Sequence, residues 1–526
     1  MKLLNKKPLE EASPESLGIS LSGIESFFHA VEASGLCLNS MMLLRHGKIA
    51  VEAYWKPFRA DMNHQLCSVS KSITSTAVGF ALEEGLFKLK SRIVDLLPEK
   101  LDCVPHPYIS AMTVRHLLMM ATPFSIWKEP VTDDWTREFL NDLPDHYPGT
   151  IFCYNTSGTH TLCEIIEKYS GVSMLDFLTP RLFDPLGIDG VEWEMSPMGV
   201  CRGGGGVRMT TQGMARFGLL YLGKGMYDGN RVLPENWVRQ ATAWHIDTSN
   251  ADNMVEGGRG YGFQFWCTRN NGYACLGLGG QIVLVLPEQD AVFVTTANVL
   301  QEQGGRYFAL ELFWDHIFPA IQTAALPSSE KLKFDFSLLN CPLPNGTFTN
   351  IAMGKNLGKR FSVKDNTIGY SAFLLDCDNQ QGKLILFNED GCDTVEFGMG
   401  KYLPSETPFQ KYASEHQTWG EFTFPDEKHP RRRASCESAA VWTGENTLII
   451  RSHIINVIQS FTLTLHFGNE AFVAQIKPFG IFAYDSLPCV LTHILEEKRI
   501  LFVRVDKQSD YVLNPASVSK DISKCL

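Results

Sequence analysis

The sequence lacks an excess of positive charge and any long apolar run. Lysine and arginine number 47 against 58 aspartates and glutamates, which gives a net charge of -11, and the densest basic run is Arg431–Arg433. An acidic chain with one short basic run does not have the electrostatic footprint of a nucleic-acid binder. No stretch reaches the ~18 apolar residues that cross a bilayer, so the sequence predicts no membrane partner.

Paired cysteines and a secretion signal are also missing. The N-terminus, MKLLNKKPLEEASPE, has no apolar run of the ~7–15 residues typical of a signal peptide. The 14 cysteines include no CxxC pair and no cysteine–histidine cluster at metal-ligand spacing. The sequence therefore predicts reduced thiols, a cytoplasmic location and no metal. It also predicts no cofactor, because no Lys-Ser/Thr follows Gly203–Gly206 as in a phosphate-binding loop, and these glycines favour a turn.

What the chain does have is a patterned order of elements. Its 526 residues exceed the size of one compact core. Apolar patterns predict, in order, a hairpin at 39–56, a helix at 71–88, a mostly helical block at 110–240, short strands at 261–298 and a helix at 303–320. This order predicts an α+β domain, in which helices flank an antiparallel sheet and a helical region is inserted between its strands.

A change of pattern near 325–335 predicts a linker. The first domain would then span residues 1–328, and residues 335–526 would form a second domain. In that second part the helical periodicity fades, and segments such as FTLTLHFG and EAFVAQIKPF alternate or run apolar over strand lengths. We therefore expect a β-rich domain there, either a barrel or a sandwich, with no role that the residues identify.

The stretch CSVSKSITSTAVGFALEEGLFKL places Ser68 three residues before Lys71. A serine hydroxyl becomes a good nucleophile when a nearby base takes its proton, and this spacing puts both side chains on one face of a helix. The alternative is that Ser68 or Ser70 only caps the helix and that Lys71 is solvated. A second SVSK, at 517–520, lies in a polar tail with no apolar helix after it, so we interpret that copy as a chance match.

Six segments in the same order resemble the serine hydrolases related to class C β-lactamases. They cover about residues 15–320 and read SVSKSITSTAVGFALEEGLFKLKSRIVDLLPE, MTVRHLLMMATPF, PGTIFCYNTSGTHTLCEIIEK, GGGGVRMTTQGMARFGLLYLGKGMYDGNRVLPENWV, YGFQFW and GLGGQIVLVLPEQDAVFVTTAN. That superfamily includes D,D-peptidases, β-lactamase-related esterases and hydrolases of short amide oligomers. The resemblance implies a β-lactamase/transpeptidase-like fold for the first domain.

The resemblance also implies a third catalytic group. Members of the family carry Tyr-x-Asn, and the matching tripeptide here is Tyr154-Asn155-Thr156. Tyr154 would share the proton of Ser68 with Lys71. Thr156 replaces the family's asparagine, which helps to orient the acylamide side chain of β-lactams, and Asn155 could substitute only in part. This departure favours an esterase or amidase over a β-lactamase.

A further departure lies on the strand that the resemblance places beside the nucleophile. The family carries Lys-Thr-Gly or His-x-Gly there, and this chain has Cys275-Leu276-Gly277. Without a lysine or histidine, nothing in the motif binds the carboxylate of a penicillin or peptide. The glycine would still admit a substrate carbonyl, and the backbone N–H of Leu278 would complete an oxyanion hole with that of Ser68.

Together these features predict a serine hydrolase that cleaves a small ester or amide through an acyl-enzyme on Ser68. Three alternatives stay open: an acyltransferase with the same acyl-enzyme, a β-lactamase, and a non-catalytic ligand-binding protein on the same fold. Four aromatic residues could line an acyl pocket or simply pack in the core: Trp127, Trp135, Tyr261 and Trp266. The residues do not decide the oligomeric state, and a homodimer is one option.

Overall fold

The computed structural model divides into two compact units, of which the first ends at Leu339 and the second begins at Asn340. The structure describes all residues except 1–6, 251–257, 300–306, 329–333, 350–356, 359, 366–370, 390, 408–433, 459, 468–470, 480–497 and 505–526. The basic run Arg431–Arg433, the second SVSK and part of the predicted linker lie outside the described residues. Each unit is described below by itself.

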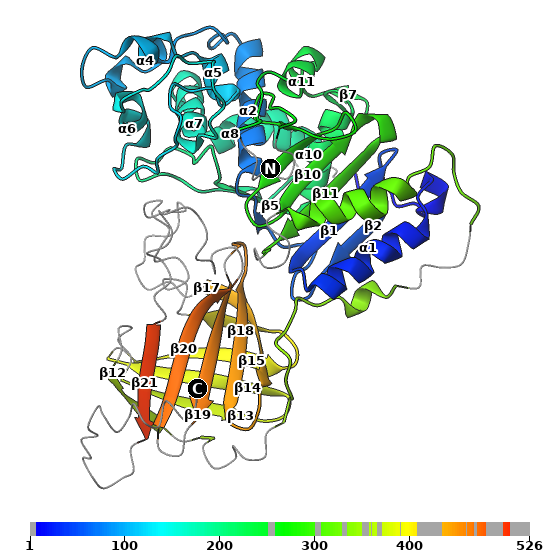
Figure 1. Ribbon diagram of the computed structural model, residues 1–526, viewed down its shortest axis with the longest axis vertical. Helices are drawn as coiled ribbons and strands as arrows, with labels where there is room; N and C mark the ends of the chain where they lie inside the picture. Colours follow the sequence, from blue (N-terminus) through cyan, green and yellow to red (C-terminus); the bar gives the residue numbers. More distant parts are fainter. Residues whose placement is uncertain are drawn as a thin grey trace. The chain divides into compact units, whose positions relative to one another are not determined.

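The first unit is built on a six-stranded antiparallel sheet with the order β2-β1-β11-β10-β9-β8 (Figure 1). The strands are β1 (Leu38–Arg45), β2 (Lys48–Tyr54), β8 (Trp266–Cys267), β9 (Tyr273–Gly277), β10 (Gln281–Leu286) and β11 (Ala291–Ala297). The hairpin turns at His46 and Gly47, both in the left-handed region that two-residue hairpin turns require. Because β1 pairs with β11, strands from the two ends of this unit are neighbours, and the predicted α+β arrangement is confirmed.

One predicted strand is largely absent. In YGFQFW only Trp266 enters β8, and Gln264 has a φ of 67° that interrupts extended structure. The carbonyl groups of Phe263 and Gln264 instead accept hydrogen bonds from Ser75 and Ser72. The segment is therefore a buried turn held by a helix, and its aromatic content reflects that burial rather than a strand.

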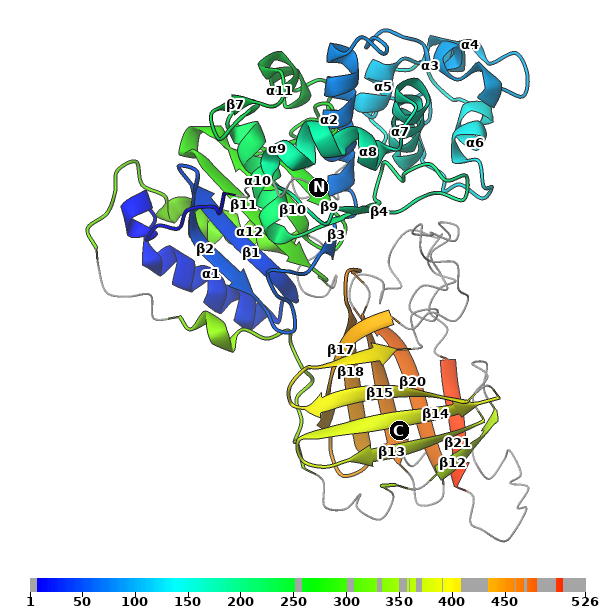
Figure 2. The same ribbon diagram turned by 180° about the vertical axis from the view of Figure 1, so that it is seen from behind.

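Helices cover both faces of the sheet (Figures 1 and 2). On one face α1 (Leu21–Ser34) packs beside α12 (Phe308–Leu312) and the π-helical turn η6 (Phe313–Ile317), with the ring of Phe293 of β11 against those of Phe27 and Phe313. On the other face α10 (Thr211–Leu222) lies so close that a Cβ at Gly218 would be 2.6 Å from Val292 Cγ1. The predicted helix at 71–88 is α2 (Val69–Glu83), which contacts β9 and ends before Gly85 at a φ of 74°.

The helical region predicted between the strands is present beside α2. Its longest helix, α7 (Thr156–Ser170), contacts α2, α5 and α6. The shorter helices are α3 (Ile93–Leu96), α4 (Pro107–Ala111), α5 (Val114–Leu118), α6 (Trp135–Asn141), α8 (Met174–Leu178), α9 (Asp184–Leu186) and α11 (Glu235–Ala241). Short strands pair as β3 (His64–Gln65), β5 (Val207–Met209) and β4 (Glu192–Trp193), and as β6 (Met226–Tyr227) and β7 (Asn230–Arg231). No helix in the described part of the chain is long and apolar enough to span a bilayer.

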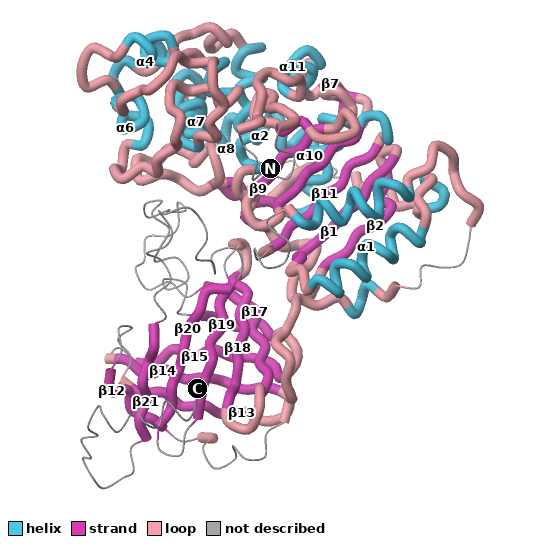
Figure 3. The backbone as a smooth tube through the Cα atoms, viewed as in Figure 1, coloured by secondary structure: helices cyan, strands magenta, loops and turns pink. Residues whose placement is uncertain are grey.

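The second unit is a ten-stranded sheet (Figure 3). Its strands are β12 (Arg360–Asp365), β13 (Ala372–Cys377), β14 (Gln381–Asn388), β15 (Gly391–Met399), β16 (Leu403–Thr407), β17 (Ala434–Trp442), β18 (Thr447–Ile454), β19 (Ser460–Phe467), β20 (Ala471–Phe479) and β21 (Lys498–Arg504). The sheet curls on itself, because β15 at one end of the order also pairs with β17 near the other. The prediction of a β-rich, barrel-like region is confirmed.

Candidate active site

The chain presents Ser68 at a sharp turn between a short strand and α2. Residues His64 and Gln65 pair with β5, and the N–H of Leu66 then donates to Val207 O at 2.9 Å. Cys67 has a φ of 48°, a left-handed conformation that is uncommon for a residue with a side chain. This turn ends the strand and places Ser68 at the N-terminus of α2, where the free N–H groups and the helix dipole favour negative charge.

Ser68 does not use its hydroxyl to cap α2. Its Oγ lies 3.0 Å from Nζ of Lys71, which also donates to the carbonyl of Gly204 at 2.6 Å. The nearby Ser70 is no cap either, since its Oγ accepts from the N–H of Val207. Lys71 is only 1% exposed, so the alternative of a helix cap beside a solvated lysine is wrong.

The charge state of Lys71 is set by its surroundings. Burial, and after it the positive charge of the neighbouring Arg202 guanidinium, together lower the pKa of this amine to about 7. A large fraction of Lys71 is therefore neutral near pH 7, with a lone pair that can accept a proton. This is the condition that a lysine must meet to act as a general base.

The turn Gly203–Gly206 closes over Lys71. A Cβ at Gly204 would lie 2.4 Å from Thr156 Cγ2 and 3.3 Å from Lys71 Nζ, and one at Gly203 would lie 2.7 Å from Thr159 O. Only residues without a side chain allow the backbone to pass between α2 and α7 at these distances. The glycine run is therefore a close-packed turn whose carbonyl groups bind Lys71 and Thr74.

A buried ion pair beneath this turn escaped sequence reasoning. Arg202 Nη1 lies 2.9 Å from Glu194 Oε2, and both side chains are less than a tenth exposed. Glu194 also accepts from Gln65 Nε2 at 3.1 Å and lies 3.4 Å from Arg208 Nη2. An arginine before a glycine run carries no motif, so no signal in the sequence links Arg202 to Lys71.

Tyr154 lies close to Lys71, whose Nζ is 4.9 Å from the centre of the phenol ring. The ring of Trp266 stacks on Tyr154 with centroids 5.7 Å apart and an angle of 22°, and Tyr261 contacts it edge-on. Both partners are buried. Tyr261 and Trp266, which sequence analysis treated as either pocket or core residues, therefore hold the orientation of Tyr154.

Asn155 and Thr156 begin α7 and have separate surroundings. The Oδ1 atom of Asn155 caps the helix by accepting from the N–H of Gly158 at 3.0 Å, and the side chain is 2% exposed. Thr156 points its methyl group toward Gly204. The carbonyl oxygen of the Asn155 amide is thus engaged in the helix cap, and Thr156 packs against the glycine whose carbonyl binds Lys71.

The segment Cys275-Leu276-Gly277 ends strand β9 beside Ser68. Burial raises the pKa of the Cys275 thiol to about 12, and this side chain is directed to Ser72 of α2. A Cβ at Gly277 would lie 2.3 Å from Leu66 O, so only glycine lets β9 approach the turn that carries Ser68. Leu278 is half-buried in the next turn, and Gln281 Nε2 donates to its carbonyl oxygen at 3.2 Å.

The histidines of this unit do not gather into a ligand set around Ser68. Burial lowers the pKa of His64 to about 4 and that of His160 to about 3, so both are neutral core residues. His116 accepts from the N–H of Thr113 at the start of α5. Within the described residues of this unit, no cluster of histidine, cysteine and carboxylate atoms lies near the serine.

Comparison with known proteins places the first unit in a family. The model of the Beta-lactamase family matches residues 39–311. A 6-aminohexanoate-dimer hydrolase of Paenarthrobacter ureafaciens is 26% identical over 288 residues, which cover 50% of this chain and 73% of that protein. Penicillin-binding protein 4* of Bacillus subtilis (strain 168) is 28% identical over 147 residues, or 26% of this chain and 31% of that protein. Among solved structures, an octameric penicillin-binding protein homologue from Pyrococcus abyssi aligns with 92% of this chain and 100% of its own, at 14% identity and a TM-score of 0.48.

Proposed function

Because this chain belongs to the beta-lactamase family of serine hydrolases, we propose that it cleaves a small ester or amide through an acyl-enzyme formed on Ser68. One observation carries the proposal. Ser68 Oγ lies 3.0 Å from the buried amine of Lys71, whose pKa of about 7 leaves it partly neutral at physiological pH. A nucleophile within hydrogen-bond reach of a base is the arrangement that covalent catalysis needs.

In the first step the neutral amine of Lys71 takes the hydroxyl proton as Ser68 Oγ attacks the substrate carbonyl. A carbon–oxygen bond forms to the serine, and the negative charge moves to the carbonyl oxygen. The backbone N–H groups of Ser68 and Leu278 would stabilise that oxyanion. Neither N–H donates to another backbone carbonyl in the described part of the chain, which supports their availability.

The tetrahedral intermediate then collapses. Its carbon–oxygen or carbon–nitrogen bond to the leaving group breaks, and that group takes the proton held between Lys71 and Tyr154. The position of the Tyr154 ring beside Lys71 supports this relay. In the second step water gives a proton to Lys71 and Tyr154 and attacks the acyl carbon. The bond between that carbon and Ser68 Oγ then breaks, and Oγ takes the proton back as the acid product leaves.

The substrate we propose has no carboxylate that needs a cation at the segment Cys275-Leu276-Gly277. The position that carries lysine or histidine in relatives of this type is Cys275, whose buried thiol faces Ser72 and offers no positive charge. We therefore expect esters or amides rather than penicillin-like substrates. A relative named as a hydrolase supports water as the acceptor, and an alcohol or amine acceptor, as in an acyltransferase, would use the same first step.

We extend the proposal to the organisation of the chain. Residues 1–328 would form the catalytic domain, since Ser68, Lys71, Tyr154 and Leu278 all lie there. Residues 335–526 would form a separate β-rich domain that contributes no group to the reaction.

Activity-based labelling and kinetics test the assignment. We expect a fluorophosphonate probe to modify Ser68, and Ser68→Ala to lose both labelling and hydrolysis of p-nitrophenyl acetate. Ser22→Ala, at an exposed serine of α1, is the matched control and should retain both. Full ester hydrolysis by Ser68→Ala would overturn the proposal. In parallel assays, nitrocefin turnover would identify a β-lactamase, and ester products formed with an added alcohol would identify an acyltransferase.

A further inference from the structure

A cavity of about 390 Å³ lies beside the start of α7 and has no part in the reaction steps above. Its walls include four aromatic side chains and two polar residues of α7's first turn: Phe124, Trp127, Trp135, Phe139, Asn155 and Ser157. Pockets for small ligands typically measure ~300–1,000 Å³ and combine apolar walls with a few polar groups. Size and lining therefore both suit a small organic group.

The cavity is close to the candidate catalytic residues through α7. Asn155 and Ser157 line it, whereas Thr156, between them, contacts Gly204. The carbonyl of Gly204 accepts directly from Lys71. The first turn of α7 is thus shared by the surroundings of Lys71 and by the wall of the cavity.

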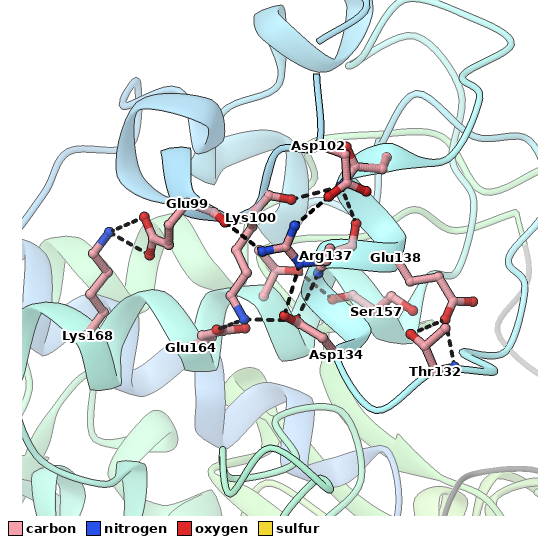
Figure 4. A network of polar contacts seen from close by, with 12 residues as sticks. Glu99, Lys100, Asp102, Thr132, Asp134, Arg137, Glu138, Ser157, Glu164 and Lys168 are labelled. Carbon is pink, nitrogen blue, oxygen red and sulfur yellow. Dashed lines mark hydrogen bonds and ion pairs between the residues drawn. The ribbon is translucent and has the colours of Figure 1, made fainter. Parts of the chain in front are cut away.

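An ion-pair network holds the α6 wall of the cavity in place (Figure 4). Asp134 caps α6 by accepting from the N–H of Arg137 at 3.1 Å. Nζ of Lys100, a residue only 8% exposed, lies 2.8 Å from Asp134 and 2.5 Å from Glu164 of α7. Lys100 thus links a carboxylate at the start of α6 to one in the middle of α7. These contacts fix the spacing of the two helices, which carry Trp135, Phe139 and Ser157.

The loop before α6, which contributes Lys128 and Pro130 to the lining, is also held by hydrogen bonds. Glu138 accepts from the N–H groups of Val131 and Thr132 and from the hydroxyl of Thr132 (Figure 4). In addition, Trp127 Nε1 donates to Ser157 Oγ at 3.2 Å. The aromatic walls are therefore positioned before any substrate arrives, which lowers the entropic cost of binding.

The charges at the rim already have partners. Lys128 pairs with Asp142 at 2.9 Å, and the carboxylate of Glu138 is occupied by its loop donors. An apolar group in the cavity gains contact with the rings.

We propose that this cavity binds an uncharged apolar group of the substrate, on the acyl side or the alcohol side of the scissile bond. The inference rests on the proposed function, since it assigns a specificity pocket to the same reaction. It commits the enzyme to esters or amides larger than acetyl derivatives.

Two substrate series test the pocket with the full chain. We expect wild type to have a kcat/KM at least about tenfold higher for p-nitrophenyl hexanoate than for the acetate, or for benzyl acetate than for methyl acetate. The series that shows the preference identifies the side of the bond that enters the cavity. Trp127→Ala should remove most of that preference.

Two matched variants separate the wall from its hydrogen bond. Trp127→Phe keeps an aromatic wall without the bond to Ser157 and should retain the preference. Trp244→Ala removes a tryptophan that is 60% exposed and lines no part of the cavity, and it should have no effect. The inference is overturned if neither series shows a preference, if Trp127→Ala keeps it, or if an acyl chain of equal length ending in an amine is preferred. Absence of any Ser68-dependent esterase activity would instead contradict the proposed function.

Discussion

The first unit buries ionisable side chains such as Lys71 and Arg202 beneath the start of α2, whereas the core cluster of the second unit is made of apolar side chains such as Phe397 and Trp442. In α2 every residue from Val69 to Ala81 is buried, including its serines and threonines. In β18 and β19 burial largely alternates along the strand, as expected for a sheet with one face in a core.

The two units differ in whether their interiors hold polar groups that need hydrogen-bond partners. Buried polar groups of α2 each need a partner, and Ser72, Thr74 and Ser75 find backbone carbonyl groups in the segments that surround Ser68. These bonds position the reacting groups at the cost of desolvation. The apolar cluster of the second unit contributes stability without comparable polar demands.

The largest effect is expected at Lys71 in the first unit, where a substitution should lower activity without lowering stability. Lys71→Met removes the base, so we expect kcat/KM for p-nitrophenyl acetate to fall by roughly 10³-fold or more. The melting temperature near pH 7 should stay the same or rise, because a buried amine is replaced by an apolar side chain of similar length. Lys88→Met, at an exposed lysine just after α2, is the control for both measurements. Retention of more than a tenth of the activity would exclude Lys71 as the base.

In the second unit we expect a core substitution to lower stability and to leave activity nearly unchanged. Phe397→Ala empties part of a core in which this side chain is fully buried, and it should cost about 3–5 kcal/mol of unfolding free energy. Because the proposed catalytic groups all lie in the first unit, kcat/KM below the unfolding transition should change by less than about twofold. Phe348→Ala, at a phenylalanine that is 51% exposed, should cost far less stability. Loss of activity in folded Phe397→Ala would show that the second unit takes part in the reaction.

A smaller effect tests the electrostatics around Lys71. With a pKa of about 7, the amine loses its proton as the pH rises, so kcat/KM should increase with pH through this region. Arg202→Met removes a cation that lowers this pKa, and the rise in kcat/KM should move to higher pH. Adding Glu194→Gln removes the partner carboxylate as well and should reverse part of the shift. Arg181→Met, whose arginine pairs with Glu84 at the surface, should leave the profile unchanged; an unmoved profile for Arg202→Met would mean that burial alone sets the pKa.

The smallest effect concerns Asn155. Asn155→Ser keeps an oxygen that can accept from the N–H of Gly158, so it should lower the free energy of unfolding by under about 0.5 kcal/mol. Asn155→Ala removes the cap and should lower it by about 1 kcal/mol. Both variants should retain KM for small esters. A raised KM in Asn155→Ser, which keeps the cap, would indicate that the amide also contacts the substrate, as sequence analysis had suggested. Thermal unfolding and steady-state kinetics distinguish the two roles.

Sequence reasoning reached those features that depend on neighbours along the chain. The three-residue spacing of Ser68 and Lys71, followed by an apolar helix, predicted that both side chains share one face of the helix. In the structure Lys71 Nζ donates a hydrogen bond to Ser68 Oγ. Periodicity also predicted the hairpin, the inserted helices and the β-rich second part. It failed at YGFQFW, because a buried turn and a buried strand have the same apolar composition and differ only in backbone geometry.

By itself, then, the sequence determined the α+β order of elements and the serine–lysine pair, since each follows from local pattern. The tertiary structure alone decided that Arg202 lies near Lys71, that Trp266 stacks on Tyr154, and that Trp127 and Trp135 line a cavity. Burial and electrostatic fields act through space, between groups that lie far apart along the chain. No local pattern carries that information until the fold brings those groups together.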